Sequence, residues 1–389
     1  MFTGLAMILL AGMGGAYLFE KLKLPGLIGM MLAGIAIGPC ALDLLGDGIM
    51  LIAPDLRELA LVVILARAGL ALNMGELRKV GRPAFLMSWV PAAFEIAGIL
   101  IFATLLLKVS LLEAAIIGAV TAAVSPAVVV PRMLGLMERG YGAKKSIPQL
   151  IMAGASVDNI VVILLFSVFL ALAAGGDSAK SCLWQVPLSV LTGIIGGVGA
   201  GGCLGRWFAH FQLRDTVKML IFLSVAFLAI AFGKLGIIPF SGLFAVICMG
   251  ITILRMNVNI ARGLSEKFRK LWVGAEVILF VLVGAEIDVR YALAAGAMIT
   301  VVVTGALLFR MAGVGCSLLG SKLNRGERLF CAAAYIPKAT VQAAIGSVPL
   351  AMGLACGQIA LAVAVVSILL TAPLGAFLID YLYPKLLDT

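Results

Sequence analysis

Residues 151–174 read IMAGASVDNIVVILLFSVFLALAA, which is long and apolar enough to cross a membrane as a helix apart from Asp158 and Asn159. A carboxylate at the centre of a membrane helix costs roughly 2.5–3.5 kcal/mol on insertion scales, so such a group usually faces a partner, a cavity or a transported ion. Small residues at 154–156 precede the pair and allow other groups to approach closely. The segment therefore predicts an ion site at Asp158, inside a membrane.

The composition of the whole chain supports this interpretation. Of its 389 residues, 63% are hydrophobic and only 12% are charged, and the mean hydropathy is +1.17. Apolar stretches that can cross a hydrocarbon core of ~30 Å recur from one end of the chain to the other. We therefore predict an all-α polytopic membrane protein, with residues 1–389 forming a single membrane domain.

The apolar runs and the residues that interrupt them predict about thirteen transmembrane helices. They lie near 2–19, 24–42, 56–74, 83–107, 111–137, 147–174, 185–209, 216–233, 236–255, 271–289, 291–319, 328–349 and 357–383.

The distribution of basic residues predicts the orientation of these helices. Alternate loops and the C-terminus hold 21 of the 29 Lys and Arg residues, and the loops on the other side hold five. Basic residues collect in cytoplasmic loops, so we expect the N-terminus outside the cell and the C-terminus in the cytoplasm. The remaining three lie within the predicted spans, at Arg67, Arg310 and Lys338.

The same distribution argues against several other classes of protein. The net charge of +10 is spread over short loops without a basic patch interleaved with aromatic residues, so we expect no nucleic-acid partner. The seven cysteines lie far apart and the chain has one histidine, which predicts packing thiols and no bound cofactor.

Two interrupted helices indicate an inverted repeat. If the seventh of thirteen spans is a connector, spans one to six and eight to thirteen run in opposite orientations. The fifth span is interrupted at Pro126 and again at Pro131, and its counterpart, the twelfth, is interrupted at Pro337. We predict two broken helices that cross near the middle of the membrane. The alternative is that these prolines only kink continuous helices.

Charged residues also occupy matching places in the two repeats. Glu95 lies in the fourth span and Arg310 in its counterpart, the eleventh, and we expect them to pair. Broken helices expose backbone carbonyls that can coordinate a cation, and their ends carry partial charges. We expect Lys338 to face the negative C-terminal ends of the half-helices.

Several motifs resemble those of the monovalent cation:proton antiporter superfamily, in its NHA branch. They include TAAVSPAVVVP at 121–131, SVDN at 156–159 and YIPKATVQAAIG at 335–346. The resemblance implies a homodimer in which a six-helix core moves like an elevator and carries Na⁺ or Li⁺ against protons. It assigns 1–82 and 185–290 mainly to dimerisation and scaffold helices, with part of the core, and 83–174 and 291–383 to the ion-translocating core repeats.

The chain departs from this family at the residue after Asp158. The family carries two adjacent aspartates, of which the second usually binds the ion, and here that position is Asn159. Three interpretations stay open: an exchanger that uses Asp158 as its only carrier carboxylate, a protein that has lost antiport, or a chain substituted to trap one state.

For the working exchanger, we expect a proton and a monovalent cation to compete for Asp158. Asn159, Thr121, Ser125 and Ser156 are the candidate oxygen ligands of the cation. With a single carrier carboxylate, exchange is expected to be electroneutral.

Other functions are weaker interpretations of the same residues. A cation-gated channel or a transport-inactive sensor would retain this architecture, and Asn159 is the feature that favours it. An intramembrane aspartyl protease needs two catalytic carboxylates, but Glu95 has Arg310 as a better partner than Asp158. We therefore expect no enzyme activity, and we expect lipids as neighbours in a cell membrane, with a prokaryotic inner membrane suggested by the compact chain.

Overall fold

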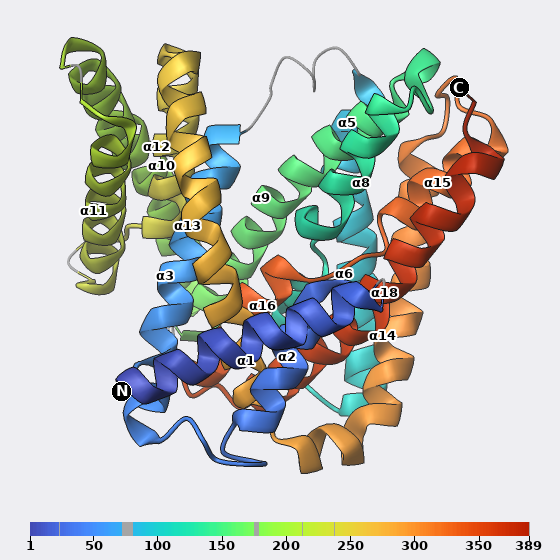
Figure 1. The fold of residues 1–389 in the computed structure, drawn as a ribbon, viewed down its shortest axis with the longest axis horizontal. Helices are drawn as coiled ribbons and strands as arrows, with labels where there is room; N and C mark the ends of the chain where they lie inside the picture. The colour runs from blue at the N-terminus through green and yellow to red at the C-terminus, as the bar shows by residue number, and fades with distance from the viewer. Residues whose placement is uncertain (23, 72–80, 175–178, 212, 237, 389) are drawn as a thin grey trace. The chain divides into compact units, whose positions relative to one another are not determined.

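A computed structural model (Figure 1) describes the chain except for residues 23, 72–80, 175–178, 212, 237 and 389. All regular elements among the described residues are helical. They form two compact units, of which the first contains Met1–Pro54, Asn73–Phe169 and Val277–Thr389 and the second contains Asp55–Leu72 and Leu170–Glu276.

The first unit contains most of the helices. They are α1 (Phe2–Lys21), α2 (Gly26–Ile37), α5 (Arg82–Met87), α6 (Val90–Phe102), the π-helical turn η1 (Ala103–Leu107), α7 (Leu111–Thr121), α8 (Pro126–Glu138), the 3-10 turn η2 (Ala143–Lys145), most of α9 (Ile147–Ala174), α14 (Val289–Ser317), α15 (Arg325–Ala334), α16 (Thr340–Gly346), α17 (Val348–Ala351) and α18 (Gly357–Leu386).

The second unit is built mainly from long helices. They are α10 (Ala179–His210), α11 (Asp215–Lys234), α12 (Gly242–Met256), most of α13 (Val258–Ala285) and most of α3 (Asp47–Ala71). Arg67 lies in this unit, where its guanidinium is 5.6 Å from the centre of the Trp272 ring.

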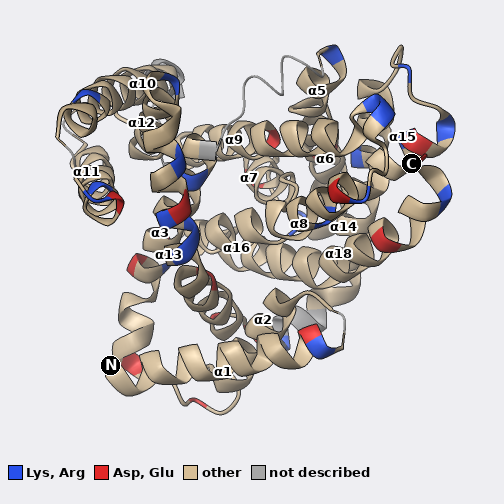
Figure 2. Ribbon diagram, turned by 45° about the horizontal axis from the view of Figure 1, so that its top comes forward, with Lys and Arg blue, Asp and Glu red and all other residues tan. Residues whose placement is uncertain are grey.

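The helices confirm a multi-pass membrane protein. Among the described residues, eight are long and apolar enough to cross a membrane, and three shorter helices are also apolar. In Figure 2, α1 is uncharged along nearly its whole length, with Glu20 and Lys21 at its end. The count of about thirteen spans and the orientation of the termini stay predictions.

Several predicted boundaries differ from the helices observed. Helix α13 begins at Val258 instead of near 271, because its charged first turns continue the apolar helix that follows. The predicted span 83–107 is divided between α5 and α6 by a turn at 88–89. The predicted interruption at Pro131 is wrong, since α8 continues through this residue.

Two broken helices confirm the predicted fold. The first consists of α7 and α8, separated by residues 122–125, and the second of α15 and α16, separated by residues 335–339. The breaks meet directly, because the Ser125 N–H donates a hydrogen bond of 2.8 Å to the Pro337 carbonyl.

The first halves of the broken helices also begin alike, as an inverted repeat requires. Helix α7 starts with a capping box of Ser110 and Glu113, and α15 starts with one of Asn324 and Glu327. In each box the two side chains satisfy backbone N–H groups that the first turn leaves free. Each half-helix therefore begins at a start signal made by residues that are close in sequence.

Helices α6 and α14 hold the matching charged residues and pack closely along each other. A Cβ atom at Gly98 of α6 would lie 3.0 Å from the Ala306 backbone, and one at Gly313 of α14 would lie 2.9 Å from the Pro91 backbone. Glycine at both positions lets the two backbones approach, as in other membrane helix pairs. This approach brings Glu95 and Arg310 within reach of each other.

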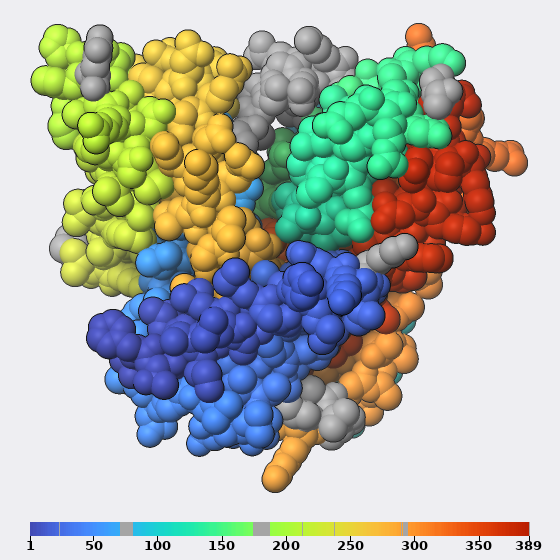
Figure 3. Space-filling model, in the orientation of Figure 1, coloured from blue at the N-terminus to red at the C-terminus, as the bar shows by residue number. Residues whose placement is uncertain are grey.

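Helices α1 and α2 form a second close contact in the first unit. Gly15 and Gly29 face each other so closely that a Cβ atom on either would overlap the carbonyl of the other. Figure 3 shows α1 across the face that is viewed. The side chains of Leu10, Met13 and Tyr17 on this helix are exposed. The pair is thus packed through its glycines and leaves an apolar surface on α1.

We predict that Gly29→Leu destabilises the protein by about 1–3 kcal/mol, the usual range for overpacking a tight contact. Thermal unfolding of the purified protein in detergent measures the effect. Gly14→Leu is the matched control, since a Cβ atom at Gly14 meets no atom within 4 Å. Equal unfolding midpoints for the two variants would contradict the packing described here.

Candidate ion-binding site

Asp158 lies in α9 and is completely buried. Its Oδ2 atom accepts a hydrogen bond of 3.0 Å from the Val124 N–H and another of 3.0 Å from Nη2 of Arg310. Its Oδ1 atom has no hydrogen-bond partner among the described residues. The protein therefore holds one oxygen of the carboxylate, and the other makes no hydrogen bond to a described residue.

Arg310, on α14, is the centre of the site and is also fully buried. Nη1 donates to Oε2 of Glu95 at 2.9 Å and to the Ala122 carbonyl, and Nε donates to the Tyr335 carbonyl at 2.8 Å. With Asp158, the guanidinium thus binds four acceptors that come from four different parts of the chain. A planar guanidinium can do this because its five N–H groups point outward in fixed directions.

Two of these acceptors are the C-terminal ends of the broken helices. Ala122 is the C-cap of α7 and Tyr335 is the C-cap of α15, so both carbonyls carry the partial negative charge of a helix end. Lys338 was expected to face these helix ends, but the hydrogen bond of its Nζ atom goes to Glu95. The guanidinium of Arg310 takes this role because it reaches both helix ends at once.

Lys338 instead pairs with Glu95. Its Nζ atom lies 2.5 Å from Oε2 of Glu95, and both side chains are buried. The predicted pair of Glu95 and Arg310 is present, but Arg310 also binds Asp158, which the sequence analysis did not anticipate. The four charged side chains form one connected group with two acidic and two basic members, so its formal charges balance.

Six buried side-chain oxygen atoms lack hydrogen-bond partners among the described residues, and besides those of Gln149 and Tyr335 there are four in the candidate site. These four are Oδ1 of Asp158, Oδ1 of Asn159, Oγ of Ser125 and Oγ1 of Thr340. Unsatisfied buried polar atoms are rare in folded proteins and call for an explanation such as an absent water or ion. A set consisting only of oxygen atoms suits a hard cation.

The other predicted ligands have partners within their own helices. The Thr121 hydroxyl donates to the carbonyls of Ile117 and Gly118, and the Ser156 hydroxyl donates to the Met152 carbonyl at 2.8 Å. Their roles as ion ligands stay predictions. Thr340 was missed, although it lies in the motif around Lys338 that the sequence analysis had singled out.

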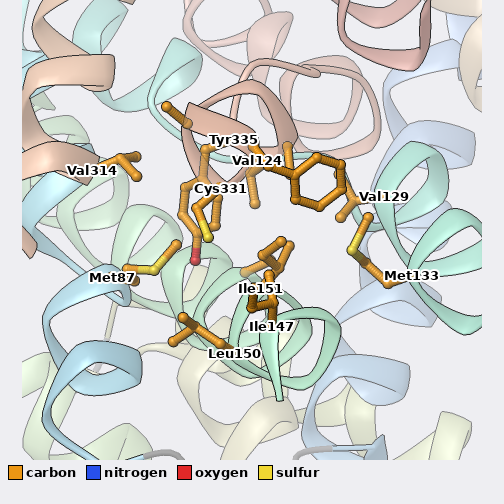
Figure 4. Close-up of a cluster of buried hydrophobic side chains, with 14 of the residues drawn as sticks. Met87, Val124, Val129, Met133, Ile147, Leu150, Ile151, Val314, Cys331 and Tyr335 are labelled. Carbon is orange, nitrogen blue, oxygen red and sulfur yellow. The ribbon is translucent and has the colours of Figure 1, made fainter. Parts of the chain in front are cut away.

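An apolar cluster packs α8, α9 and α15 together next to these charges (Figure 4). The view shows side chains from all three helices, including Val129, Ile151 and Cys331, each at most 2% exposed. Tyr335 belongs to the cluster and its ring also faces Arg310, with 5.3 Å between the guanidinium carbon and the ring centre. Such packing keeps water away from the ion pairs and strengthens them.

The crossed broken helices and the buried carboxylate define a membrane protein with the sodium/proton antiporter fold. Solved structures of MjNhaP1, a sodium proton antiporter from Methanocaldococcus jannaschii, have this fold. The match at pH 8 has a TM-score of 0.83 and 24% sequence identity and covers 98% of this chain and 97% of that one. A second MjNhaP1 structure matches with a TM-score of 0.75.

The sequence places the chain in a family. Residues 5–381 match the family described as "Sodium/hydrogen exchanger, transmembrane". Among its relatives, sodium/hydrogen exchanger 9B2 of Homo sapiens is 34% identical over 94% of this chain and 70% of its own length. Human sodium/hydrogen exchanger 9B1 is 31% identical over 94% of this chain and 73% of its own. The chain therefore belongs to the sodium/hydrogen exchanger family.

We predict that Arg310→Lys destabilises the protein strongly, by roughly 3–5 kcal/mol, as expected when a buried charge group loses a partner. A lysine ammonium cannot reach acceptors on four elements, so it leaves buried carbonyls or a carboxylate unpaired. Thermal unfolding in detergent measures the loss.

Arg269→Lys serves as the control for this substitution, since Arg269 makes an exposed pair with Glu266. That variant is expected to match the parent protein within about 0.5 kcal/mol. If Arg310→Lys behaved in the same way, Arg310 would not be the centre of the group.

Proposed function

We propose that this chain is a secondary transporter that exchanges a monovalent cation, Na⁺ or Li⁺, for protons across a membrane. One observation carries the proposal: Asp158 is fully buried, with one oxygen paired to Arg310 and the other without a partner in the part of the chain that the structure describes. Membership of the sodium/hydrogen exchanger family supports it, as do the names of the relatives and of the structural neighbour.

The Asp158 carboxylate performs the exchange by binding one ion at a time. Its free Oδ1 atom can take a proton, or it can share a cation with the oxygens of Asn159, Ser125 and Thr340. The two ions exclude each other because they use the same oxygen atom. The hydrogen bonds on Oδ2 keep the carboxylate oriented in either case.

The charges of the group favour electroneutral exchange. Asn159 cannot release a proton. Of the adjacent residues Asp158 and Asn159, only Asp158 can therefore bind a proton and a cation in turn. A proton and a Na⁺ ion carry the same charge, so the group of Asp158, Glu95, Arg310 and Lys338 has the same total charge with either ion bound. Replacing one ion with the other moves no net charge.

We also propose elevator-type alternating access, in which 83–174 and 291–383 carry the site and move against dimerisation helices. The charged residues, both breaks and the four free oxygens all belong to the first compact unit. A site held together by its own buried ion pairs can travel without being taken apart.

A homodimer surrounded by lipid in a cell membrane completes the proposal. The motifs that resemble the antiporter superfamily imply the dimer. The apolar side chains on α1, such as Leu10 and Met13, suit contact with lipid or with a second copy.

The second candidate function is a transport-inactive homologue or a cation-gated channel or sensor. Asn159 favours it, because this residue replaces the aspartate that usually binds the ion in the resembled family. Binding of a cation without counter-transport of protons would identify such a protein.

We predict that Na⁺ or Li⁺ dissipates a pH gradient in proteoliposomes that contain the protein, and that Asp158→Asn abolishes the effect. The substitution removes the carboxylate whose Oδ1 atom is buried without a hydrogen-bond partner among the described residues. A pH-sensitive dye measures the gradient, and Gln149→Leu, in the first turns of the same helix, is the control. If exchange requires Asn159→Asp, the chain as it stands is a disabled or trapped antiporter and the second candidate function gains support.

We predict that the rate of this exchange does not change when a membrane potential is imposed with K⁺ and valinomycin. One cation leaves for each proton that enters, so the potential does no work on the cycle. Flux that follows the potential would contradict a single carrier carboxylate.

A further inference from the structure

Gln342 lies in α16 and is fully buried, beyond the break that contains Lys338. Its Nε2 atom donates hydrogen bonds to the carbonyls of Thr121 at 3.1 Å and Ala123 at 2.7 Å. Its Oε1 atom accepts a hydrogen bond of 2.8 Å from the Ala339 N–H. One amide therefore binds the backbone of both breaks, which are more than two hundred residues apart in sequence.

These contacts fix the orientation of the amide. A flipped side chain would place the NH₂ group against the Ala339 N–H and the oxygen against two carbonyl oxygens. The orientation observed uses both donors and one acceptor at once. A glutamine meets this requirement without adding charge, whereas a lysine or arginine in its place would add a positive charge to a group whose charges are balanced.

The carbonyls that Gln342 binds need donors for a general reason. The last carbonyls of α7 have no partner in their own helix because the helix ends there, and a buried carbonyl without a donor is costly. Arg310 supplies the donor for Ala122, and Gln342 supplies the donors for its two neighbours. The first break thus depends on one charged and one neutral side chain.

The position of Gln342 links these contacts to the ion site. Ala123 is followed by Val124, whose N–H binds Asp158. The next residue is Ser125, whose hydroxyl oxygen has no hydrogen-bond partner among the described residues. Ala339 directly precedes Thr340, which supplies another free oxygen. By holding 121–123 and 339 together, the amide sets the distance between oxygens contributed by different repeats.

We propose that Gln342 is a positioning residue that holds the two crossing segments in the register that the ion site requires. It touches no transported ion and acts through the backbone of both breaks. Its effect on transport rests on the proposed exchange of a cation for protons, but its effect on the crossing segments does not.

Hydrogen–deuterium exchange of the protein in detergent tests whether Gln342 holds the two crossing segments in register. This test does not require transport activity. In Gln342→Met, which keeps the length of the side chain but loses all three hydrogen bonds, amides in 121–125 and in 335–340 are expected to exchange faster together. Peptides from α18 should keep their rates. Faster exchange in the second segment alone, or in neither, would overturn the proposal.

Gln342→Glu distinguishes the role of the amide NH₂ group from the role of the amide oxygen. Its carboxylate can still accept from the Ala339 N–H but presents no donor to Thr121 and Ala123, so the first segment is expected to loosen more than the second. Equal protection of both segments in this variant would contradict the assigned donors.

Proteoliposomes test the consequence for the proposed exchange. For Gln342→Met we expect the KM for Na⁺ to rise about tenfold, since loss of about one net hydrogen bond changes an equilibrium by that factor. KM does not depend on the amount of active protein, so a residue that only aids folding would lower the maximal rate and leave KM unchanged. That second result would overturn the positioning role.

Gln149→Met is the matched control, because the Oε1 atom of Gln149 has no hydrogen-bond partner among the described residues. Its KM for Na⁺ and its hydrogen–deuterium exchange rates should equal those of the parent. If both Gln342 variants aggregate while Gln149→Met stays folded, Gln342 has only a structural role. If the parent shows no exchange of cations for protons, the proposed function fails. Hydrogen–deuterium exchange still decides whether Gln342 holds the two crossing segments in register.

Discussion

The Arg310 guanidinium is the interaction on which the rest of this structure depends. It pairs with Asp158 and Glu95 and also binds the C-cap carbonyls of α7 and α15. Two half-helix ends that point at each other repel, and two carboxylates in an apolar interior repel as well. A single delocalised cation reduces both repulsions at once, because its donors point in several directions in one plane. Glu95 is shared with Lys338, which extends the group to the second break.

Where the broken helices cross, backbone N–H and C=O groups need hydrogen-bond partners, and side chains supply many of them. Residues 122–125 and 335–339 are buried and lie between helices, so several of their N–H and C=O groups need partners outside a helical turn. The structure supplies partners from Arg310, Gln342 and Thr371, and from the other break through Ser125 and Pro337. Among the described residues, one oxygen of Asp158 and the hydroxyl oxygens of Ser125 and Thr340 remain without a hydrogen-bond partner. The candidate ion site therefore consists of side-chain oxygens that no described residue satisfies.

Asn159 distinguishes this site from the paired aspartates of the antiporters that the motifs resemble. Asp158 is bound to Arg310 and to the Val124 N–H, while the Asn159 oxygen has no hydrogen-bond partner among the described residues. The two positions thus have different surroundings, although they are adjacent in sequence. An amide at the second position retains an oxygen for a cation and gives up a titratable group. This difference is the physical basis for the single carrier carboxylate proposed here.

The sequence by itself determined the membrane class, the two broken helices and the pairing of Glu95 with Arg310. These features follow from hydrophobicity, from the effect of proline on a helix and from the scarcity of charge inside membranes. Each of these can be recognised in the sequence without knowing which helices pack together. It did not predict that Arg310 also binds Asp158, that Lys338 binds only Glu95 within the charged group, or that Thr340 has a free oxygen. Those facts depend on which atoms meet when α6, α9 and α14 pack around the breaks. Helix order and spacing do not specify such distances, so only the tertiary structure decided them.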